Sequence, residues 1–224
     1  MDQIYREVEL LLSSDQSGHN MQHINRVINL SLKFNQTEKG NPQLIYLIAL
    51  LHDVDDYKLC NKYDSDNLTN AITIMNKCNI DVETKNHVLK AINEIGYSKR
   101  LKGITPTSLE AKIVSDADMC DALGANGILR TYQYGLNKNR PFFDKNNLPN
   151  ADIDINIYTT KTSTGINHFF EKLLRLKNLM LTEEGKKEAL YRHSLMIAFL
   201  KHYFEEENAK MWLTLLSTFE KNNF

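Results

Sequence analysis

The sequence predicts an all-α protein. Apolar residues recur three and four positions apart through most of the 224 residues, which is the spacing that gives a helix one apolar face. Residues typical of helix starts stand where these runs begin, for example Pro42 and Asp81. The alternation typical of a strand is confined to Ile153, Ile155 and Ile157. Together these observations favour a helical bundle over a mixed fold.

The first three helices are expected at residues 2–13, 19–37 and 42–52. The first is short and amphipathic. The second keeps one face for packing, carried by Ile24, Val27, Ile28, Ser31, Leu32 and Phe34. Pro42 suits the first turn of the third helix, because the N–H groups there have no acceptor within the helix.

The next helices are expected at residues 67–78 and 82–95, the latter opened by Asp81 as its N-cap. Another begins near Thr107 or Ser108, just after Pro106, and carries the segment KIVSDAD. Two glycines, at positions 124 and 127, fall inside or between the helices that follow, where a missing Cβ permits close packing.

Residues 137–163 interrupt the helical pattern. The stretch is polar, rich in Asn and Asp, and holds two of the four prolines. Connections of this length are uncommon in a compact domain unless they are functional or disordered, so we expect an insertion or lid rather than core. Helices resume at about 164–181, 182–207 and 209–219. The length allows one large domain, which we expect to span residues 1–224.

A His-Asp doublet, His52-Asp53, ends the apolar run LIYLIALLHD. With His23 upstream and Asp118 downstream it offers two imidazoles and two carboxylates, a set that can hold one divalent cation and leave positions open for substrate. Neighbouring residues do not share a helix face. Both members of the doublet therefore reach one ion only if the helix unwinds there or the ion lies across its end.

Four segments in this order resemble the HD-domain superfamily of metal-dependent phosphohydrolases. They are SSDQSGHNMQHINRV, ALLHDVDDYK, KIVSDADMCDALGANGILRTYQYG and STGINHFFEKLLRLKNLM. The resemblance is to a small bacterial subfamily that includes nucleotide pyrophosphohydrolases, and it implies an all-α HD-domain bundle. The chain has Gly18-His19-Asn20 where that subfamily usually reads GHD, and residues 95–99 replace its ISFKG-like stretch.

The resemblance implies a role for several polar residues. It assigns the metal to His23, His52, Asp53 and Asp118. Asp56 becomes the catalytic carboxylate, which accepts a proton from the attacking water or fixes its orientation. The alternative, a solvated loop acid, applies to Asp56 and still more to Asp55. Asp121 is expected near the metal ligands, and Asp116 as a cap or salt-bridge partner.

We expect one metal ion, because relatives with two carry extra histidines between the doublet and the last Asp, where this chain has His87 alone. Mn is favoured, with Fe, Co, Ni, Mg or Zn as alternatives for mixed imidazole and carboxylate ligands. The residues expected to bind substrate are His19, Lys99, Arg140, His168 and Lys172. Each of the cations could instead be a solvated surface charge.

The favoured function is hydrolysis of a phosphate ester or anhydride in a nucleotide, from nucleoside triphosphate to monophosphate plus pyrophosphate. The alternatives are a phosphomonoesterase or phosphodiesterase on the same metal, and a non-catalytic module that senses a nucleotide. Product analysis separates them, because only the favoured reaction releases pyrophosphate and a sensor releases no product.

Bulk composition restricts the partners. Lys and Arg total 27 against 28 Asp and Glu, a formal charge of −1 that offers no footprint for nucleic acid. No stretch approaches the roughly 20 apolar residues that cross a bilayer, and MDQIYREVEL does not resemble a signal peptide. Three cysteines without CxxC spacing suit a reducing cytosol. We therefore expect a cytoplasmic protein acting on a small phosphorylated molecule, with its oligomeric state left open.

Overall fold

The computed structural model describes residues 2–13, 20–56, 60, 62–149 and 163–221. Within these ranges the regular structure is helical and no strand occurs, which confirms the predicted all-α class. The chain divides into two compact units, Met1–Asp118 and Met119–Phe224. That one domain spans residues 1–224 stays a prediction.

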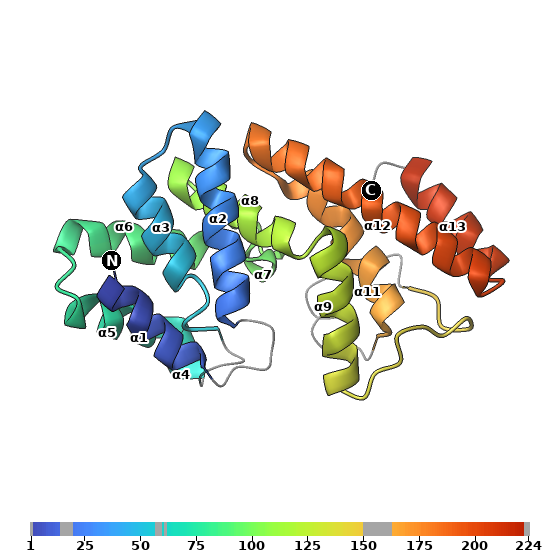
Figure 1. Ribbon diagram of the computed structural model, residues 1–224, viewed down its shortest axis with the longest axis horizontal. Helices are drawn as coiled ribbons and strands as arrows, with labels where there is room; N and C mark the ends of the chain where they lie inside the picture. Colours follow the sequence, from blue (N-terminus) through green and yellow to red (C-terminus); the bar gives the residue numbers. More distant parts are fainter. Residues whose placement is uncertain (1, 14–19, 57–59, 61, 150–162, 222–224) are drawn as a thin grey trace. The chain divides into compact units, whose positions relative to one another are not determined.

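Unit 1 is built around α3, which packs chiefly against α2 and α6 and also against α1 (Figure 1). Its helices are α1 (Asp2–Leu12), α2 (Met21–Glu38), α3 (Pro42–Leu51), α4 (Lys62–Asn67), α5 (Thr69–Lys77), α6 (Val82–Glu94), α7 (Tyr97–Leu101) and α8 (Leu109–Asp121), of which α8 crosses into unit 2 at its last turn. Six of the ten residues of α3 are buried. A helix that is apolar on nearly every side is a core helix, so α3 is a rigid base for the residues that follow it.

Both ends of α3 match the sequence prediction. Asn41 is the N-cap, and its side chain accepts hydrogen bonds from the N–H groups of Gln43 and Leu44. Pro42 follows in the first turn as expected. The helix ends at Leu51, and His52 is its C-cap. The doublet therefore lies where the helix stops, which is the arrangement that lets both side chains reach one point.

Unit 2 contains α9 (Gly124–Asn137), α11 (Gly165–Glu171), the 3₁₀ helix η1 (Leu173–Leu179), α12 (Glu183–Glu206) and α13 (Lys210–Lys221). The long α12 packs against α9, η1 and α13. Its buried positions recur at helical spacing, from Gly185 through Ala189, His193 and Met196 to Leu200 and Phe204. These residues form the part of the unit 2 core that α12 contributes.

The segment 137–163, expected to be an insertion or lid rather than core, is in part packed against the core of unit 2. Its first residue still belongs to α9. Phe142 lies edge-on to Phe169 and Tyr203, while Phe143 packs against Phe204 and Trp212. The indole N–H of Trp212 donates to the carbonyl of Lys145. Aromatic packing thus holds this end of the segment against the helices of unit 2. Residues 150–162 lie outside the described part, so the lid itself stays a prediction.

Two predicted helices are divided in the structure. The helix expected at 67–78 begins only at Thr69, because Leu68 adopts a left-handed backbone with φ 53° and separates α4 from α5. The helix expected at 164–181 breaks at Lys172, whose φ of −137° and ψ of −62° separate α11 from η1. In the described residues, no helix is both long and apolar enough to cross a bilayer.

Candidate metal centre

Three helices of unit 1 bring the four expected metal ligands together. His23 lies in the first turn of α2, and His52 and Asp53 follow the last residue of α3. Asp118 lies in the last turn of α8. Asn20 caps α2, accepting from the N–H groups of Gln22 and His23, and so fixes the turn that presents His23.

The polar atoms of these side chains converge on one point. Nε2 of His23 is 3.3 Å from Nε2 of His52, 3.2 Å from Oδ2 of Asp53 and 3.6 Å from Oδ1 of Asp118. Nε2 of His52 is 3.4 Å from Oδ2 of Asp53 and 3.8 Å from Oδ1 of Asp118. Ligands held about 2.0 to 2.2 Å from one metal ion are themselves separated by roughly 3 to 3.6 Å. The observed spacing therefore suits a shared cation.

The backbone sets the tautomer of His52. Its Nδ1 lies 2.8 Å from the carbonyl oxygen of Ala49, and because a carbonyl can only accept, Nδ1 carries the proton. Nε2 of a neutral ring is then left with a lone pair directed at the cluster. A ring N–H bonded to a backbone carbonyl is the usual orienting partner of a metal-binding histidine.

The imidazoles of the cluster are more deeply buried than its carboxylates. The side chains of His23 and His52 are each 2% exposed, whereas those of Asp53 and Asp118 are 14% and 25% exposed. The cluster of donor atoms is therefore shielded from solvent at its two nitrogens and reaches solvent at its two carboxylates. His23, His52 and Asp118 alone place three ligand atoms within 4.8 Å of one another. The residues present thus fit a divalent ion with one side open to substrate.

Asp55 is not the solvated acid that the alternative assigned to it. It is 4% exposed, and its two oxygens accept hydrogen bonds from the N–H groups of Asn70 and Ala71 at 2.8 Å each. Burial raises the pKa of the Asp55 carboxyl, and these N–H donors lower it part of the way back. Asp56 belongs to the same turn, since its N–H donates to the carbonyl of Asp53, and its catalytic role stays a prediction.

Two further acids of α8, Asp116 and Asp121, are buried. Asp121 is paired with the guanidinium of Arg130, so this arginine holds a buried carboxylate. Asp116 lies in the middle of α8 with no exposed surface, and it is therefore not a helix cap.

The expected substrate residues are divided between the units. Lys99 is in α7 of unit 1. In unit 2, Arg140 lies over the ring of Tyr134 at 5.9 Å, His168 is in α11, and Lys172 ends that helix. His19 lies outside the described residues. The role of each in binding substrate stays a prediction.

Two asparagines support the centre and were not predicted to do so. Asn20 stands directly before the helical run, and its residue type is a signal for an N-cap that the sequence already offered. Asn70 donates from Nδ2 to the carbonyl of Val54, 16 residues earlier. A local sequence pattern does not predict a contact between segments that are so far apart in the chain.

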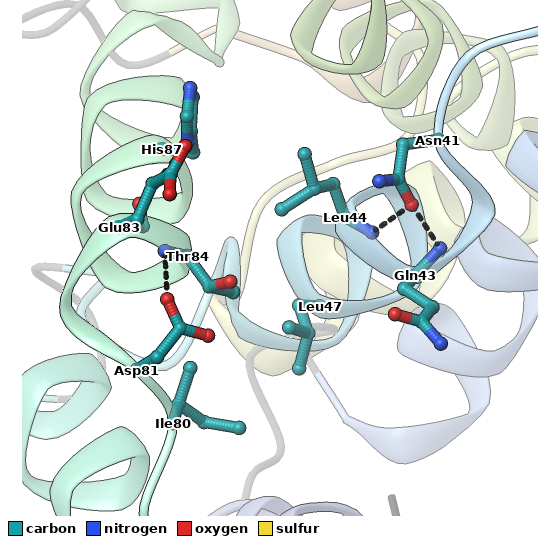
Figure 2. A pocket seen from close by; sticks show the side chains of 9 residues that line it. All are labelled: Asn41, Gln43, Leu44, Leu47, Ile80, Asp81, Glu83, Thr84 and His87. Carbon is teal, nitrogen blue, oxygen red and sulfur yellow. Dashed lines mark hydrogen bonds between the residues drawn. The ribbon is translucent and has the colours of Figure 1, made fainter.

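A pocket of about 340 Å³ lies elsewhere in unit 1 (Figure 2). Leu44 and Leu47 of α3 face the start of α6, where Asp81, Glu83 and His87 line the opposite wall. It includes none of the expected site residues, and two carboxylates on its rim disfavour a phosphate. We therefore place the candidate chemistry at the His-Asp cluster and not in this pocket.

Comparison with known proteins decides the family. The HD domain family matches residues 20–123, a range that holds all four residues of the cluster. An HD-superfamily hydrolase from Bacillus thuringiensis is 34% identical, with a TM-score of 0.71 over 93% of this chain and 96% of that one. The chain belongs to the HD superfamily.

Two further relatives are also similar to this HD protein over nearly the whole length of the chain. The crystal structure of a Lactobacillus plantarum protein is 30% identical, with a TM-score of 0.82 over 93% of this chain and 96% of that one. YpgQ of Bacillus subtilis is 29% identical over 201 residues, which are 89% of this chain and 90% of YpgQ. A crystal structure of YpgQ is a complex with ADP; it gives a TM-score of 0.69 at 26% identity, covering 92% of this chain and 96% of that one.

Proposed function

We propose that this HD protein is a metal-dependent phosphohydrolase that converts a nucleoside triphosphate to the monophosphate and pyrophosphate. The observation that carries the proposal is the convergence of four donor atoms from His23, His52, Asp53 and Asp118. The ADP bound by the relative YpgQ supports a nucleotide as the substrate class.

The donor set fits a single divalent cation, for which Mn is favoured, because imidazole nitrogen and carboxylate oxygen suit the same range of first-row metals. When bound, such an ion supplies Lewis acidity that draws in phosphate oxygens and acidifies a water molecule. Burial of His23 and His52 excludes water from one side of the centre. We propose that substrate enters on the side of the more exposed Asp118.

Asp56 is proposed to take up the proton that hydrolysis releases. A bond forms between the oxygen of water and the α-phosphorus. The bond from that phosphorus to the bridging oxygen breaks, and its electron pair leaves with pyrophosphate. Asp56 lies three residues past the doublet in the turn that Asp53 begins, and a carboxylate there can accept the proton of the attacking water.

The cations Lys99, Arg140 and Lys172 are proposed to bind the outer phosphates, with His19 and His168 as further contacts. If the outer phosphates are held in this way, the α-phosphorus is the atom presented to water. Replacing each cation by Gln should raise KM for a triphosphate more than it lowers kcat, because the lost contact is made in the ground state as well as in the transition state.

A product-resolved screen of nucleotides with added Mn²⁺ tests the reaction. Pyrophosphate together with a monophosphate is expected. Orthophosphate would indicate a phosphomonoesterase, a cleaved diester would indicate a phosphodiesterase, and saturable binding without product would indicate a sensor. Water labelled with heavy oxygen then locates the attack, since label in the monophosphate is expected and label in pyrophosphate or orthophosphate contradicts α-attack.

A further inference from the structure

The turn that carries the His-Asp doublet is fastened to the start of α5 by three hydrogen bonds. Oδ1 of Asp55 accepts from the N–H of Asn70, and Oδ2 accepts from the N–H of Ala71, both at 2.8 Å. Nδ2 of Asn70 donates back to the carbonyl of Val54 at 2.9 Å. The bonds are reciprocal, and the carboxylate that makes two of them is buried.

The start of α5 needs these bonds because its own N-cap residue supplies none. Leu68 is the N-cap, and it makes no capping bond through its side chain. The first N–H groups of a helix have no acceptor within the helix, and a carboxylate is favoured at that end. Asp55 supplies the missing acceptor from 15 residues away. It is therefore a remote cap, and the cap joins two segments that the sequence keeps apart.

The same turn is tied at its other end to α3. The N–H of Val54 donates to the carbonyl of Leu51, the last residue of α3, and the N–H of Asp56 donates to the carbonyl of Asp53. On the far side, α5 is itself held by packing against α1 and α6, with Ala71, Ile74 and Met75 buried. Residues 52–56 are thus bound between two fixed helices.

We propose that Asp55 and Asn70 are positioning residues for the metal centre, which hold the 52–56 turn on α5 and thereby fix the direction in which Asp53 presents its carboxylate. The inference rests on the proposed function in one respect, since that function makes Asp53 a metal ligand. Asn70 is bonded to both Val54 and Asp55, the two residues that follow Asp53. The backbone of Asp53 therefore has little freedom to turn its carboxylate away from His23 and His52.

Two variants release the turn without touching a metal ligand. Asp55→Asn keeps the size of the side chain but turns one oxygen into an amide that cannot accept from a backbone N–H. Asn70→Ala is milder, because it removes only the bond to Val54 and leaves both bonds of the Asp55 carboxylate. Loss of a group that orients a ligand typically weakens metal affinity about 10- to 100-fold. Asp55→Asn should reach that range and Asn70→Ala its lower end.

Asp81→Asn is the matched control. Asp81 is also a carboxylate that caps a helix of unit 1, accepting from the N–H of Thr84 at 2.9 Å, but it caps α6 and has no bond to the turn. Mn²⁺ affinity would be measured for the wild type and the three variants by the loss of the free-ion paramagnetic resonance signal. Circular dichroism identifies which variants are folded. Asn70→Ala remains informative if Asp55→Asn does not fold.

A second measurement needs no metal. Amide hydrogen exchange of Val54 and Asp56 reports on the turn directly, because the N–H of Val54 ties the turn to Leu51 of α3 and the N–H of Asp56 bonds to Asp53 within the turn. In the metal-free protein, faster exchange at these two amides is expected for Asp55→Asn and Asn70→Ala but not for Asp81→Asn. Wild-type exchange together with wild-type Mn²⁺ affinity in a folded Asp55→Asn or Asn70→Ala protein would overturn the positioning role.

The two proposals fail in different ways. A wild type that binds Mn²⁺ but hydrolyses no nucleotide removes the proposed reaction and leaves the positioning role intact. A wild type that binds no divalent ion removes both. Variants whose exchange is faster but whose Mn²⁺ affinity is unchanged show a turn that is fastened for stability alone, which contradicts positioning of the metal centre.

Discussion

The Nε2 atoms of His23 and His52 face each other at 3.3 Å, with the two rings inclined by 62°. Since Nδ1 of His52 donates to Ala49, its Nε2 brings a lone pair to this contact. Oδ2 of Asp53 lies 3.2 Å and 3.4 Å from the same two nitrogens. The lone pair of His52 Nε2 and the carboxylate of Asp53 repel each other at this distance, and positive charge placed between them, from a bound cation or from a proton on His23, removes that repulsion.

Removing one ligand should therefore cost more than removing an orienting group. His52→Ala and Asp118→Ala are each expected to weaken Mn²⁺ affinity by more than about 100-fold, above the 10- to 100-fold typical of lost orienting partners. Elemental analysis of the purified proteins measures this. His87→Ala is the control, because His87 is exposed on α6 and is bonded through Nδ1 to the carbonyl of Glu83. Full occupancy in Asp118→Ala would exclude Asp118 from the ligand set.

Asp56 should affect turnover rather than metal content. Asp56→Asn keeps the shape of the side chain and removes the proton acceptor, so kcat is expected to fall about 100-fold or more while Mn²⁺ remains bound. Steady-state kinetics combined with metal analysis distinguish the two effects. Asp66→Asn serves as the control, because Asp66 is an exposed acid of the nearby sequence in α4. A wild-type rate in Asp56→Asn would make Asp56 a structural or surface acid.

The parts of the fold that the sequence predicts are those with a strong local signal. Pro42 and the cap before it mark the start of α3, and Asp81 marks the start of α6. Periodicity also locates α12 within one residue at each end of the expected 182–207. In each case the apolar face is long and the cap is a residue type that favours caps, so local and tertiary preferences agree.

The breaks in helices lacked such a signal. Leucine rarely adopts a left-handed backbone, yet Leu68 does so where α5 is capped by Asp55 from elsewhere in the chain. Leu173, Leu174 and Leu176 are buried in η1, although the sequence of that segment is equally compatible with an α-helix. Both outcomes are set by tertiary contacts, which a sequence pattern does not contain.

The candidate site, like the fold, could be predicted from the sequence only in part. The resemblance of four segments placed His23, His52, Asp53 and Asp118 in one cluster, and the distances agree. The acidic run after the doublet did not reveal which carboxylate is buried. That depends on the position of Asn70 and Ala71, which residues 53–56 do not determine.

Gly165 should be intolerant of a side chain. A Cβ there would lie 2.6 Å from Cδ2 of Phe142 and 3.2 Å from its carbonyl oxygen. The backbone of Phe142 is held in place, because its carbonyl accepts from the N–H of Ile166 at 2.8 Å. Gly165→Ala is expected to destabilise the protein by about 1 to 3 kcal/mol, as overpacking does. The measurement is the free energy of unfolding in urea.

Two comparisons make that experiment specific. Gly135→Ala is the control, because its Cβ meets only the carbonyl of Arg140 at 3.5 Å, and alanine inside a helix is favoured over glycine by about 0.5 to 1 kcal/mol. Phe142→Leu placed in the Gly165→Ala background should recover part of the loss, because the ring edge is removed. Wild-type stability in Gly165→Ala would show that the Phe142 ring moves aside at little cost.

Acid should weaken unit 2 through His193. This side chain is buried on α12, and its Nδ1 has no hydrogen-bond partner. Burial, assisted by the positive charge of Lys177, lowers its pKa from 6.5 to about 4. The ring is therefore neutral in the folded protein at a pH where the unfolded chain already carries the proton.

The sign follows from proton binding. Between pH 6.5 and about 4 the unfolded state binds more protons at His193 than the folded state, so the free energy of unfolding falls as the pH is lowered through this range. As the pH rises above 6.5 this contribution fades, because the unfolded state also loses the proton. One such group accounts for at most about 1.4 kcal/mol per pH unit.

His193→Gln cannot take up the proton and should show a shallower decline in urea unfolding experiments across the same interval. His202→Gln, an exposed position on the same helix, should keep the wild-type slope. An unchanged slope in His193→Gln would mean that other groups, not this histidine, set the acid sensitivity.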